Sequence, residues 1–312
     1  MAKASLTAVR VIHAVAAALA AGRPVVALES SVLAQGLPIP HNRQAAERMT
    51  RAVELGAALP AITAVVRGVA TLGLEPKELE RFLARDGVRK VAARDLAVAM
   101  AQKADGATTV AASLCIAAAA NAQVFATGGI GGVHRDAPFD ESGDLVELAR
   151  TPMVVVCAGA KSILDLHATL ERLETLGVTV LGYRTDELPG FFTKTTGLRL
   201  SARADSPEEI AAIHRAARAL GRRQATLVVQ QPPDDVALPQ VLVDEAVTEA
   251  LHDARVAGVT GAGTTPFLLA AVLRITGGRS LLTNLGLLEQ NAALAARIAV
   301  AIRVEADTCH QG

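Results

Sequence analysis

Aromatic residues are nearly absent from this 312-residue chain, which has no tryptophan, one tyrosine and six phenylalanines. Basic and acidic residues balance at 31 each, so the formal net charge is zero. Without excess positive charge there is no field to attract nucleic-acid phosphates, and without aromatic rings there are few surfaces on which bases stack. We therefore expect a small-molecule ligand and no nucleic-acid partner.

Cysteine and long apolar runs are also scarce. The three cysteines are far apart and form no Cys-x-x-Cys pair, so the sequence predicts neither a disulfide framework nor a zinc knuckle. We expect Cys115 and Cys157 to be small buried side chains and Cys309 to lie in a frayed tail. The longest apolar run, 111–120, is too short to cross a bilayer. The composition therefore predicts a cytoplasmic protein with no membrane segment.

Apolar residues make up 51% of the sequence and charged residues 20%, which is enough to bury a large core. Short apolar runs alternate with amphipathic stretches, a pattern typical of strands covered on both faces by helices. We predict an α/β fold with three layers, α/β/α, around a large, mostly parallel mixed sheet. No repeat or linker divides the chain, so we predict one domain over 1–312. The expected strands are 24–28, 61–66, 124–127, 153–157, 178–182 and 227–230, and the expected helices are 42–55, 107–120, 162–176 and 207–220.

Glycines stand at three predicted helix ends, where a residue with left-handed backbone can stop a helix. They are Gly56, Gly177 and Gly221. The run Ser-Pro-Glu-Glu at 206–209 predicts a helix start. Its serine can cap the helix and Glu209 can reach back to complete a capping box.

A lysine follows the predicted strand 153–157, within the run Cys-Ala-Gly-Ala-Lys-Ser. An ammonium among small and apolar residues is poorly hydrated, so desolvation disfavours its charged form. A helix N-terminus starting directly after it would act in the same direction. Lys161 is therefore our candidate for a covalent nucleophile. The alternative is an ordinary surface lysine at a strand end.

A carboxylate follows the predicted strand 24–28, and two serines come after it. Ligands of open α/β sheets collect beyond the carboxyl ends of strands, so this position suits a reacting group. Glu29 is our candidate general acid or base. It could instead cap a following helix or pair with an arginine.

The most glycine-dense stretch is 127–135, Thr-Gly-Gly-Ile-Gly-Gly-Val-His-Arg, which follows the predicted strand 124–127. Its glycines can turn backbone N–H groups toward an anion or let a substrate approach closely. The spacing does not match a dinucleotide fingerprint, which would need glycine at His134. Because no second histidine stands near His134, the sequence predicts no zinc site there.

Two charged segments remain. The run Asp-Glu-Ser-Gly-Asp at 140–144 offers oxygen ligands, which suit a divalent cation such as Mg²⁺ or Mn²⁺ that keeps most of its waters. Its alternative is an acidic helix N-terminus leading into 145–149. Lys90 or Arg94 could bind a phosphate. Surface charge is the alternative for both.

These segments occur in one chain in a fixed order, together with three further runs. Two of these are Gly-Leu-Pro-x-Pro at 36–40 and Thr-Pro-Phe-Leu-Leu at 265–269. Together with Gly-Ala-Thr-Thr-Val-Ala at 106–111, they closely resemble pseudouridine-5′-phosphate glycosidases, the family that includes the indigoidine-cluster protein. The resemblance covers about 6–303.

The resemblance implies reversible cleavage of the C–C glycosidic bond of pseudouridine 5′-phosphate to ribose 5-phosphate and uracil, through a lysine Schiff base. The family's nucleophile falls on Lys161 and its proton donor on Glu29. Asp140 would hold Mn²⁺ or another divalent cation such as Mg²⁺, with no organic cofactor, and the family suggests a homotrimer. Substrate contacts carry over to Lys90, Val110, Ser142, Gly143, Asp144, Thr127, His134 and Asn284.

Three positions depart from the family pattern. Gln35 stands where a histidine is common, Ala262 where a lysine is often found, and Gln290 replaces the first of two asparagines. They leave the identity of the base open. One alternative is therefore a C-ribosylating enzyme of secondary metabolism that joins ribose 5-phosphate to another acceptor.

Two further alternatives belong to other classes. A phosphosugar-binding protein without turnover would lose Lys161 or Glu29, and both are present. A sugar kinase would need an aspartate directly after the glycine turn at 261–263. This chain has Thr-Thr-Pro there, which argues against a kinase.

Overall fold

A computed structural model of the chain describes residues 9–135, 139–259 and 263–308. Its centre is an 11-stranded sheet with the order β1-β4-β3-β2-β7-β8-β11-β9-β10, and β6 joins β5 to β3. Among the described strand pairs, only β3–β4 and β3–β6 are antiparallel. The mostly parallel mixed sheet confirms the predicted α/β class. The strands are β1 (Arg10–Val11), β2 (Val25–Leu28), β3 (Leu59–Val66), β4 (Val69–Leu72), β5 (Val88–Val91), β6 (Asp105–Thr108), β7 (Val124–Ala126), β8 (Val154–Cys157), β9 (Thr179–Tyr183), β10 (Ala202–Ala204) and β11 (Thr226–Val229).

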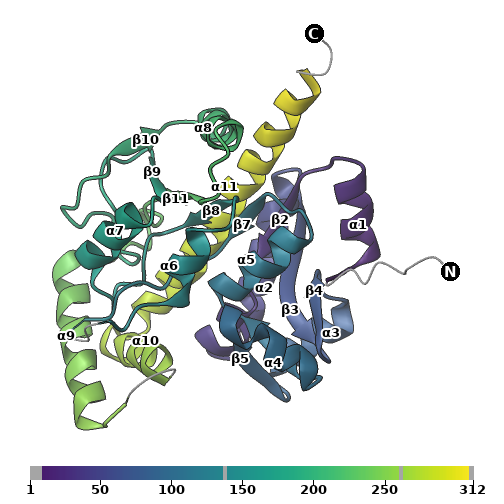
Figure 1. The fold of residues 1–312 in the computed structure, drawn as a ribbon. Coiled ribbons are helices and arrows are strands. Elements are labelled where there is room, and N and C mark those ends of the chain that lie inside the picture. The colour runs from purple at the N-terminus through teal and green to yellow at the C-terminus, as the bar shows by residue number, and fades with distance from the viewer. Residues whose placement is uncertain (1–8, 136–138, 260–262, 309–312) are drawn as a thin grey trace.

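Helices cover both faces of this sheet, which gives the three predicted layers (Figure 1). The α-helices are α1 (His13–Ala20), α2 (His41–Leu55), α3 (Pro76–Ala84), α4 (Leu96–Ala101), α5 (Val110–Ala119), α6 (Gly143–Leu148), α7 (Leu166–Thr175), α8 (Pro207–Ala219), α9 (Gln240–Val256), α10 (Thr264–Ile275) and α11 (Arg279–Thr308). A π-helical turn, η1 (Val32–Gly36), and a 3-10 turn, η2 (Ala93–Asp95), complete the set.

The long helix α11 crosses the molecule and packs against α2, α8, β7 and β8 (Figure 1). Its segment Arg279–Arg303 is long and apolar enough to span a membrane. This segment was not identified from the sequence, because only the uninterrupted apolar run 111–120 was considered. However, 67% of its most apolar window is buried inside the protein. Because its apolar side chains fill the space beside the sheet, α11 serves as a core helix.

All six predicted strands are present, each within two residues of its predicted ends. One predicted helix is wrong at its start, because residues 105–108 form β6 and α5 begins only at Val110. Thr108 explains the difference. Its hydroxyl is buried among strand neighbours and donates to Thr63 O at 2.9 Å, a partner that a helical residue would not reach.

A second helix begins later than predicted, and this affects the site. The expected helix 162–176 starts at Leu166, where Asp165 caps it by accepting from Ala168 N at 2.9 Å. Residues 162–165 therefore form a turn, and no helix N-terminus directly follows Lys161. The prediction of a helix dipole beside Lys161 is therefore wrong.

The three helices end within one residue of their predicted ends, but only two of the three glycines have the predicted left-handed backbone. Gly177 and Gly221 have left-handed backbone, with φ of 70° and 71°. Gly56 has φ −82°, and the left-handed residue after α2 is Ala57 at φ 60°. At the start of α8, Ser206 accepts from Glu209 N at 3.1 Å, but the Glu209 carboxylate bonds the N–H of the preceding residue, Asp205.

The two described cysteines are free. Cys157 is buried and Cys115 is partly buried. Burial raises the pKa of both thiols to about 12, so neither is a thiolate at neutral pH. Cys309 lies outside the described residues.

His214 on α8 gives the fold a pH-dependent stability. Its side chain is 2% exposed, and its Nδ1 lies 3.0 Å from Thr226 Oγ1. Burial, helped by the positive charges of Arg218 and Arg215, lowers the pKa of His214 from 6.5 to about 4. The unfolded chain therefore takes up a proton at a higher pH than the folded protein does. This contribution to stability is complete above pH 6.5 and is lost as pH falls toward 4.

We predict that His214→Asn flattens this part of the stability profile, because an amide keeps a partner for Thr226 but does not titrate. In the parent protein, His214 should contribute a slope of up to about 1.4 kcal/mol per pH unit. Urea unfolding at several pH values between 4 and 6.5 measures the slope. Equal slopes for the two proteins would contradict the assignment.

Candidate active site

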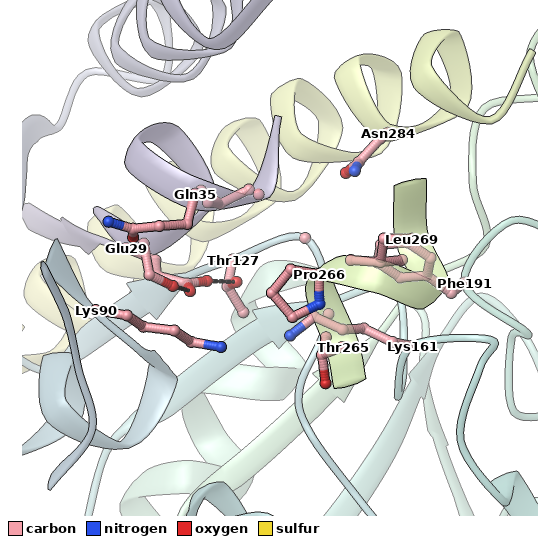
Figure 2. Close-up of a pocket in the computed structure, with 15 residues that line it drawn as sticks. Glu29, Gln35, Lys90, Thr127, Lys161, Phe191, Thr265, Pro266, Leu269 and Asn284 are labelled. Atoms are coloured by element: carbon pink, nitrogen blue, oxygen red, sulfur yellow. Dashed lines mark hydrogen bonds between the residues drawn. The ribbon is translucent and has the colours of Figure 1, made fainter. Parts of the chain in front are cut away.

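The candidate site lies at the carboxyl ends of three neighbouring strands, β2, β7 and β8. Glu29 follows β2, Thr127 follows β7, and Lys161 follows β8 after a short turn. Because these strands are parallel and adjacent, their ends meet at one edge of the sheet. The three side chains line one cavity with an empty volume of about 530 Å³, part of it open to solvent (Figure 2).

Glu29 is held by two hydroxyl groups. Its side chain is 4% exposed, Ser31 Oγ donates to its Oε1, and Thr127 Oγ1 donates to its Oε2 at 2.5 Å (Figure 2). Among the described residues, Glu29 caps no helix and pairs with no arginine, so the alternative interpretations of this residue are wrong. Both oxygens have a fixed direction, which is what a proton-transfer group requires.

Buried hydroxyls support the strand end beside Glu29. Ser30 Oγ accepts from Thr108 N at 2.8 Å, and Thr108 Oγ1 lies 2.9 Å from Thr63 Oγ1. Thr63 Oγ1 also donates to Leu28 O at 3.0 Å. Since these groups are buried and satisfied, they fix the end of β2 to β3 and β6 and limit the movement of Glu29.

The Lys161 turn and the glycine-rich loop extend the pairing of β7 with β8. Lys161 N donates to Ile130 O and Ile130 N donates to Gly159 O, both at 3.1 Å. Arg135 Nε then donates to Leu164 O at 3.0 Å. Gly159 has φ 89°, and a Cβ there would lie 2.7 Å from Pro189 O, so the turn requires glycine. The backbone of Lys161 is therefore fixed on both sides.

Asn291 on α11 anchors the start of the glycine-rich loop. Its Nδ2 donates to Thr127 O at 2.8 Å, and its Oδ1 accepts from Gln230 Nε2 at 2.8 Å. Gln290 donates to Gln230 Oε1 and Gln231 O, and it does not line the cavity. Asn291 was not identified from the sequence, because its partner is a main-chain carbonyl 164 residues away.

Close packing explains most of the glycines in 127–135. A Cβ at Gly129 would lie 2.6 Å from the Phe191 ring and 2.9 Å from Gly159 O. At Gly131 and Gly132 a Cβ would overlap Ser142 and Thr169. Among these glycines, Gly128 and Gly129 line the cavity described above, and Gly131 lines a second cavity beside it, so three of the four glycines lie where a ligand could approach the backbone.

We predict that Gly129→Ala lowers the free energy of unfolding by about 1–3 kcal/mol, because the backbone oxygen of Gly159 cannot easily move. Gly143→Ala is the matched control. A Cβ at Gly143, in the first turn of α6, meets nothing within 4 Å. Urea unfolding of both variants measures the difference. Equal stability of the two would contradict the packing argument.

Asp144 links the start of α5 to the glycine-rich loop. Its side chain is 5% exposed, its Oδ1 accepts from Ala111 N at 2.9 Å, and its Oδ2 accepts from Gly131 N at 2.8 Å. It lies in the first turn of α6, which Ser142 caps by accepting from Asp144 N. The structural alternative for 140–144, an acidic helix start, therefore describes this part of the chain.

The carboxylates of 140–144 differ in their availability. Asp144 is engaged by two backbone donors, and Glu141 pairs with Arg172 at 2.8 Å. Asp140 is exposed and, like His134, lines a second cavity that adjoins the one around Glu29 and Lys161. Within the described part of the chain, no three His, Cys, Asp or Glu side chains gather to hold a metal. The residues thus fit an ion that takes one carboxylate and otherwise water.

A second, outer cavity adjoins the first. It is lined by the N-terminus of α5, the η2 turn and the start of α6, and it includes Val110, His134, Asp140 and Ser142. Both cavities share Glu29, Ser31, Lys90, Lys161 and Thr265. They form one cleft with a polar outer chamber and a more apolar inner chamber. Glu29 and Lys161 lie where the chambers meet.

Lys90, on β5, points its amine into this cleft (Figure 2). Lys90 is exposed as a whole residue, but the surroundings of its amine lower the pKa of Lys90. Desolvation by burial is the main cause, and the positive charge of Lys161 adds to it. Lys90 therefore places a partly desolvated amine in the cleft, and the alternative of a solvated surface charge does not describe it. Arg94 also lines the outer chamber, next to Asp95.

The inner chamber brings together residues that the sequence singled out and one, Phe191, that it did not. Gln35 comes from η1, Phe191 from the segment after β9, and Pro266 and Leu269 from α10 (Figure 2). Asn284 reaches in from α11. The 265–269 motif indicated α10, whereas nothing in the local sequence distinguished Phe191. Ala262 lies outside the described residues.

Comparisons with known proteins agree with this geometry. The family model described as indigoidine synthase A like protein matches residues 14–301. A protein of Gemmatimonas aurantiaca named pseudouridine-5′-phosphate glycosidase is 65% identical over 91% of this chain and 93% of its own length. One of the same name from Herpetosiphon aurantiacus is 49% identical over 92% and 96%.

Two solved structures have the same fold. The prealnumycin C-glycosynthase AlnA, in complex with ribulose 5-phosphate, matches with a TM-score of 0.89 at 36% identity, over 96% of this chain and 98% of AlnA. An indigoidine synthase A-like protein of Thermotoga maritima matches with a TM-score of 0.87 at 32% identity, over 95% and 96%.

Proposed function

The chain belongs to the indigoidine synthase A-like family, and from this premise we propose that it is an enzyme that cleaves pseudouridine 5′-phosphate with water to ribose 5-phosphate and uracil. The relatives with this named activity cover more than nine-tenths of the chain. The observation that carries the proposal is the position of Lys161 and Glu29 at the junction of a polar and an apolar chamber.

The two chambers match the two halves of this substrate. The outer chamber holds the Lys90 amine, whose positive charge favours an anion, beside the start of α5, where Asp144 already binds Ala111 N. The sugar phosphate fits there, with Val110, Ser142 and Gly143 around it. The inner chamber presents the Phe191 ring and apolar side chains, which suit a flat base. The glycosidic bond then lies beside Lys161 and Glu29.

A C–C bond to a ribose has no ready leaving group, which is the reason for a lysine. In the first step, the Lys161 amine attacks the anomeric carbon, and the bond from that carbon to the ring oxygen breaks. Glu29 gives its proton to this oxygen, which becomes a hydroxyl. The new amine returns a proton to Glu29. The product is an open-chain adduct on Lys161 that still carries uracil.

In the second step, Glu29 protonates the uracil carbon that carries the sugar. The nitrogen lone pair forms a C=N bond while the C–C bond breaks, and its electrons stay with the uracil ring. Water then adds to the Schiff base, and collapse of that adduct releases ribose 5-phosphate and the amine. The sum consumes one water and no oxidant or cofactor electron. The phosphate, held in the outer chamber, orients the reacting carbon.

Three finer points belong to the same proposal. A hydrated Mn²⁺ or Mg²⁺ on Asp140 would supply positive charge near the sugar phosphate, in line with the one free carboxylate of 140–144. A homotrimer would cover exposed apolar side chains such as Leu55 and Leu282. A cytoplasmic location suits a phosphorylated substrate, since a phosphate ester does not cross a membrane unaided.

A second function is favoured by one specific match. AlnA, 36% identical over nearly its whole length, is named as a C-glycosynthase. The same lysine adduct, run in reverse, joins a sugar phosphate to a carbon nucleophile. An enzyme with this role would form a C-glycoside from ribose 5-phosphate and an acceptor other than uracil.

Product analysis tests the proposal. Incubation with pseudouridine 5′-phosphate should release uracil and ribose 5-phosphate in equal amounts, which chromatography and a reducing-sugar assay measure. The reverse reaction, with ribose 5-phosphate and a panel of ring acceptors, separates the two functions. Efficient coupling to another ring with no reaction of uracil would reject the glycosidase assignment in favour of the second function.

A further inference from the structure

One hydroxyl group at the junction of the two chambers has no partner in the protein. Five residues line both chambers: Glu29, Ser31, Lys90, Lys161 and Thr265. The first four already have a role, since Ser31 orients Glu29 and the two lysines bind the sugar phosphate. Thr265 is partly exposed, and within the part of the chain that the structure describes its hydroxyl makes no hydrogen bond. It is therefore available to a ligand at the junction.

The position of Thr265 in α10 explains why its hydroxyl is available. Threonines further inside helices turn back and donate to the carbonyl one turn earlier. Thr50, inside α2, donates in this way to Ala46 O at 2.8 Å, and Thr248, inside α9, does the same at 2.7 Å. Thr265 is the second residue of α10, so the helix has no carbonyl one turn before it. Its hydroxyl must find a partner outside the helix.

Helix α10 holds this hydroxyl in a defined place. Leu268 and Val272 of α10 are buried, and the helix packs against α9, α11 and η1. Figure 2 shows Thr265 on the same side of the cavity as the Lys161 amine, whereas Glu29 and Lys90 lie on the other side. A sugar bonded to Lys161 therefore lies within the part of the cleft that Thr265 lines.

We infer that Thr265 binds the hydroxyl group on C2 of the sugar and makes the enzyme selective for ribose over 2-deoxyribose. This inference rests on the proposed function for the place of the sugar. With C1 bonded to Lys161 and the phosphate in the outer chamber, C2 is the carbon next to the junction. C3 and C4 lie further toward the phosphate. A threonine hydroxyl can donate and accept, so it can pair with the C2 hydroxyl in either direction.

Deoxy substrates test this role. Thr265→Val keeps the shape of the side chain and removes the hydroxyl, whereas Thr265→Ser keeps the hydroxyl. We would measure kcat/KM for pseudouridine 5′-phosphate and for its 2′-deoxy and 3′-deoxy analogues. Relative to the parent on the same substrate, Thr265→Val should lose roughly tenfold with the complete substrate and with the 3′-deoxy analogue. It should lose nothing with the 2′-deoxy analogue. Thr265→Ser should behave like the parent with all three.

Each comparison uses one substrate, so the intrinsic reactivity of a deoxy sugar cancels. An equal loss of Thr265→Val with all three substrates would mean that the valine disturbs α10 and that Thr265 does not read C2. A loss that disappears with the 3′-deoxy analogue in place of the 2′-deoxy analogue would also overturn the inference.

Borohydride trapping with sugar phosphates that carry no base separates this inference from the proposed function. Thr265→Val should need roughly tenfold more ribose 5-phosphate than the parent for half-maximal labelling. With 2-deoxyribose 5-phosphate the two proteins should need equal concentrations. If the parent is labelled by ribose 5-phosphate but does not cleave pseudouridine 5′-phosphate, the proposed function is wrong. The trapping ratios then still decide whether Thr265 binds the C2 hydroxyl.

Discussion

Lys161→Ala is expected to reduce turnover of pseudouridine 5′-phosphate by about 10⁴-fold or more, because the variant lacks the atom that bonds to the sugar. The fold should survive. Lys161 is partly exposed to the cleft, and its backbone N–H keeps its bond to Ile130 O. Removing the side chain therefore opens no cavity in the core. Steady-state kinetics and a urea unfolding curve measure the two effects separately.

Lys90 provides the matched control for this experiment. It is the second lysine of the cleft, and the pKa of Lys90 is lowered by burial and by Lys161, so it is the amine most able to take over. In our assignment Lys90→Ala weakens phosphate binding and raises KM, but it leaves the nucleophile in place. Borohydride reduction with ribose 5-phosphate should add mass at Lys161 in the parent and in Lys90→Ala. Labelling at Lys90 alone would transfer the nucleophile's role to that residue.

The central strands were predictable because their own side chains favour a buried strand. Runs such as Val154–Cys157 are β-branched, apolar and buried on both faces, as a central parallel strand requires. The missed strands β1, β4, β5, β6 and β10 have two to four residues, and each contains charged or small side chains. Their partners on neighbouring strands define them, and those partners are not visible locally.

The site divides in a similar way. Lys161, Glu29 and Thr127 follow strand ends, so the sequence alone indicated their common edge of the sheet. The role of Asp144 was not predictable, because its carboxylate is bound by donors from α5 and the glycine-rich loop. Phe191 was missed because only the packing of the segment after β9 turns it into the cavity.

Glu29→Gln is expected to lower turnover of pseudouridine 5′-phosphate by about 10²- to 10⁴-fold, because an amide cannot deliver a proton to the ring oxygen or to uracil. The fold should tolerate the change. The Ser31 hydroxyl, which now donates to Glu29, can rotate and accept from the amide instead. The Thr127 hydroxyl can continue to donate to the remaining oxygen.

The same variant separates proton transfer from nucleophilic attack. Ribose 5-phosphate reaches its open-chain aldehyde without the enzyme, so Schiff-base formation on Lys161 does not need Glu29 to open the ring. Glu29→Gln should therefore keep most of the borohydride labelling at Lys161 while it loses cleavage. Thr127→Val removes one of the two hydroxyls that orient the carboxylate, and it should lower kcat by a smaller factor, about tenfold. An equal loss of labelling and cleavage in Glu29→Gln would mean that Glu29 acts on the lysine itself. The assignment of Glu29 to proton transfer alone would then be wrong.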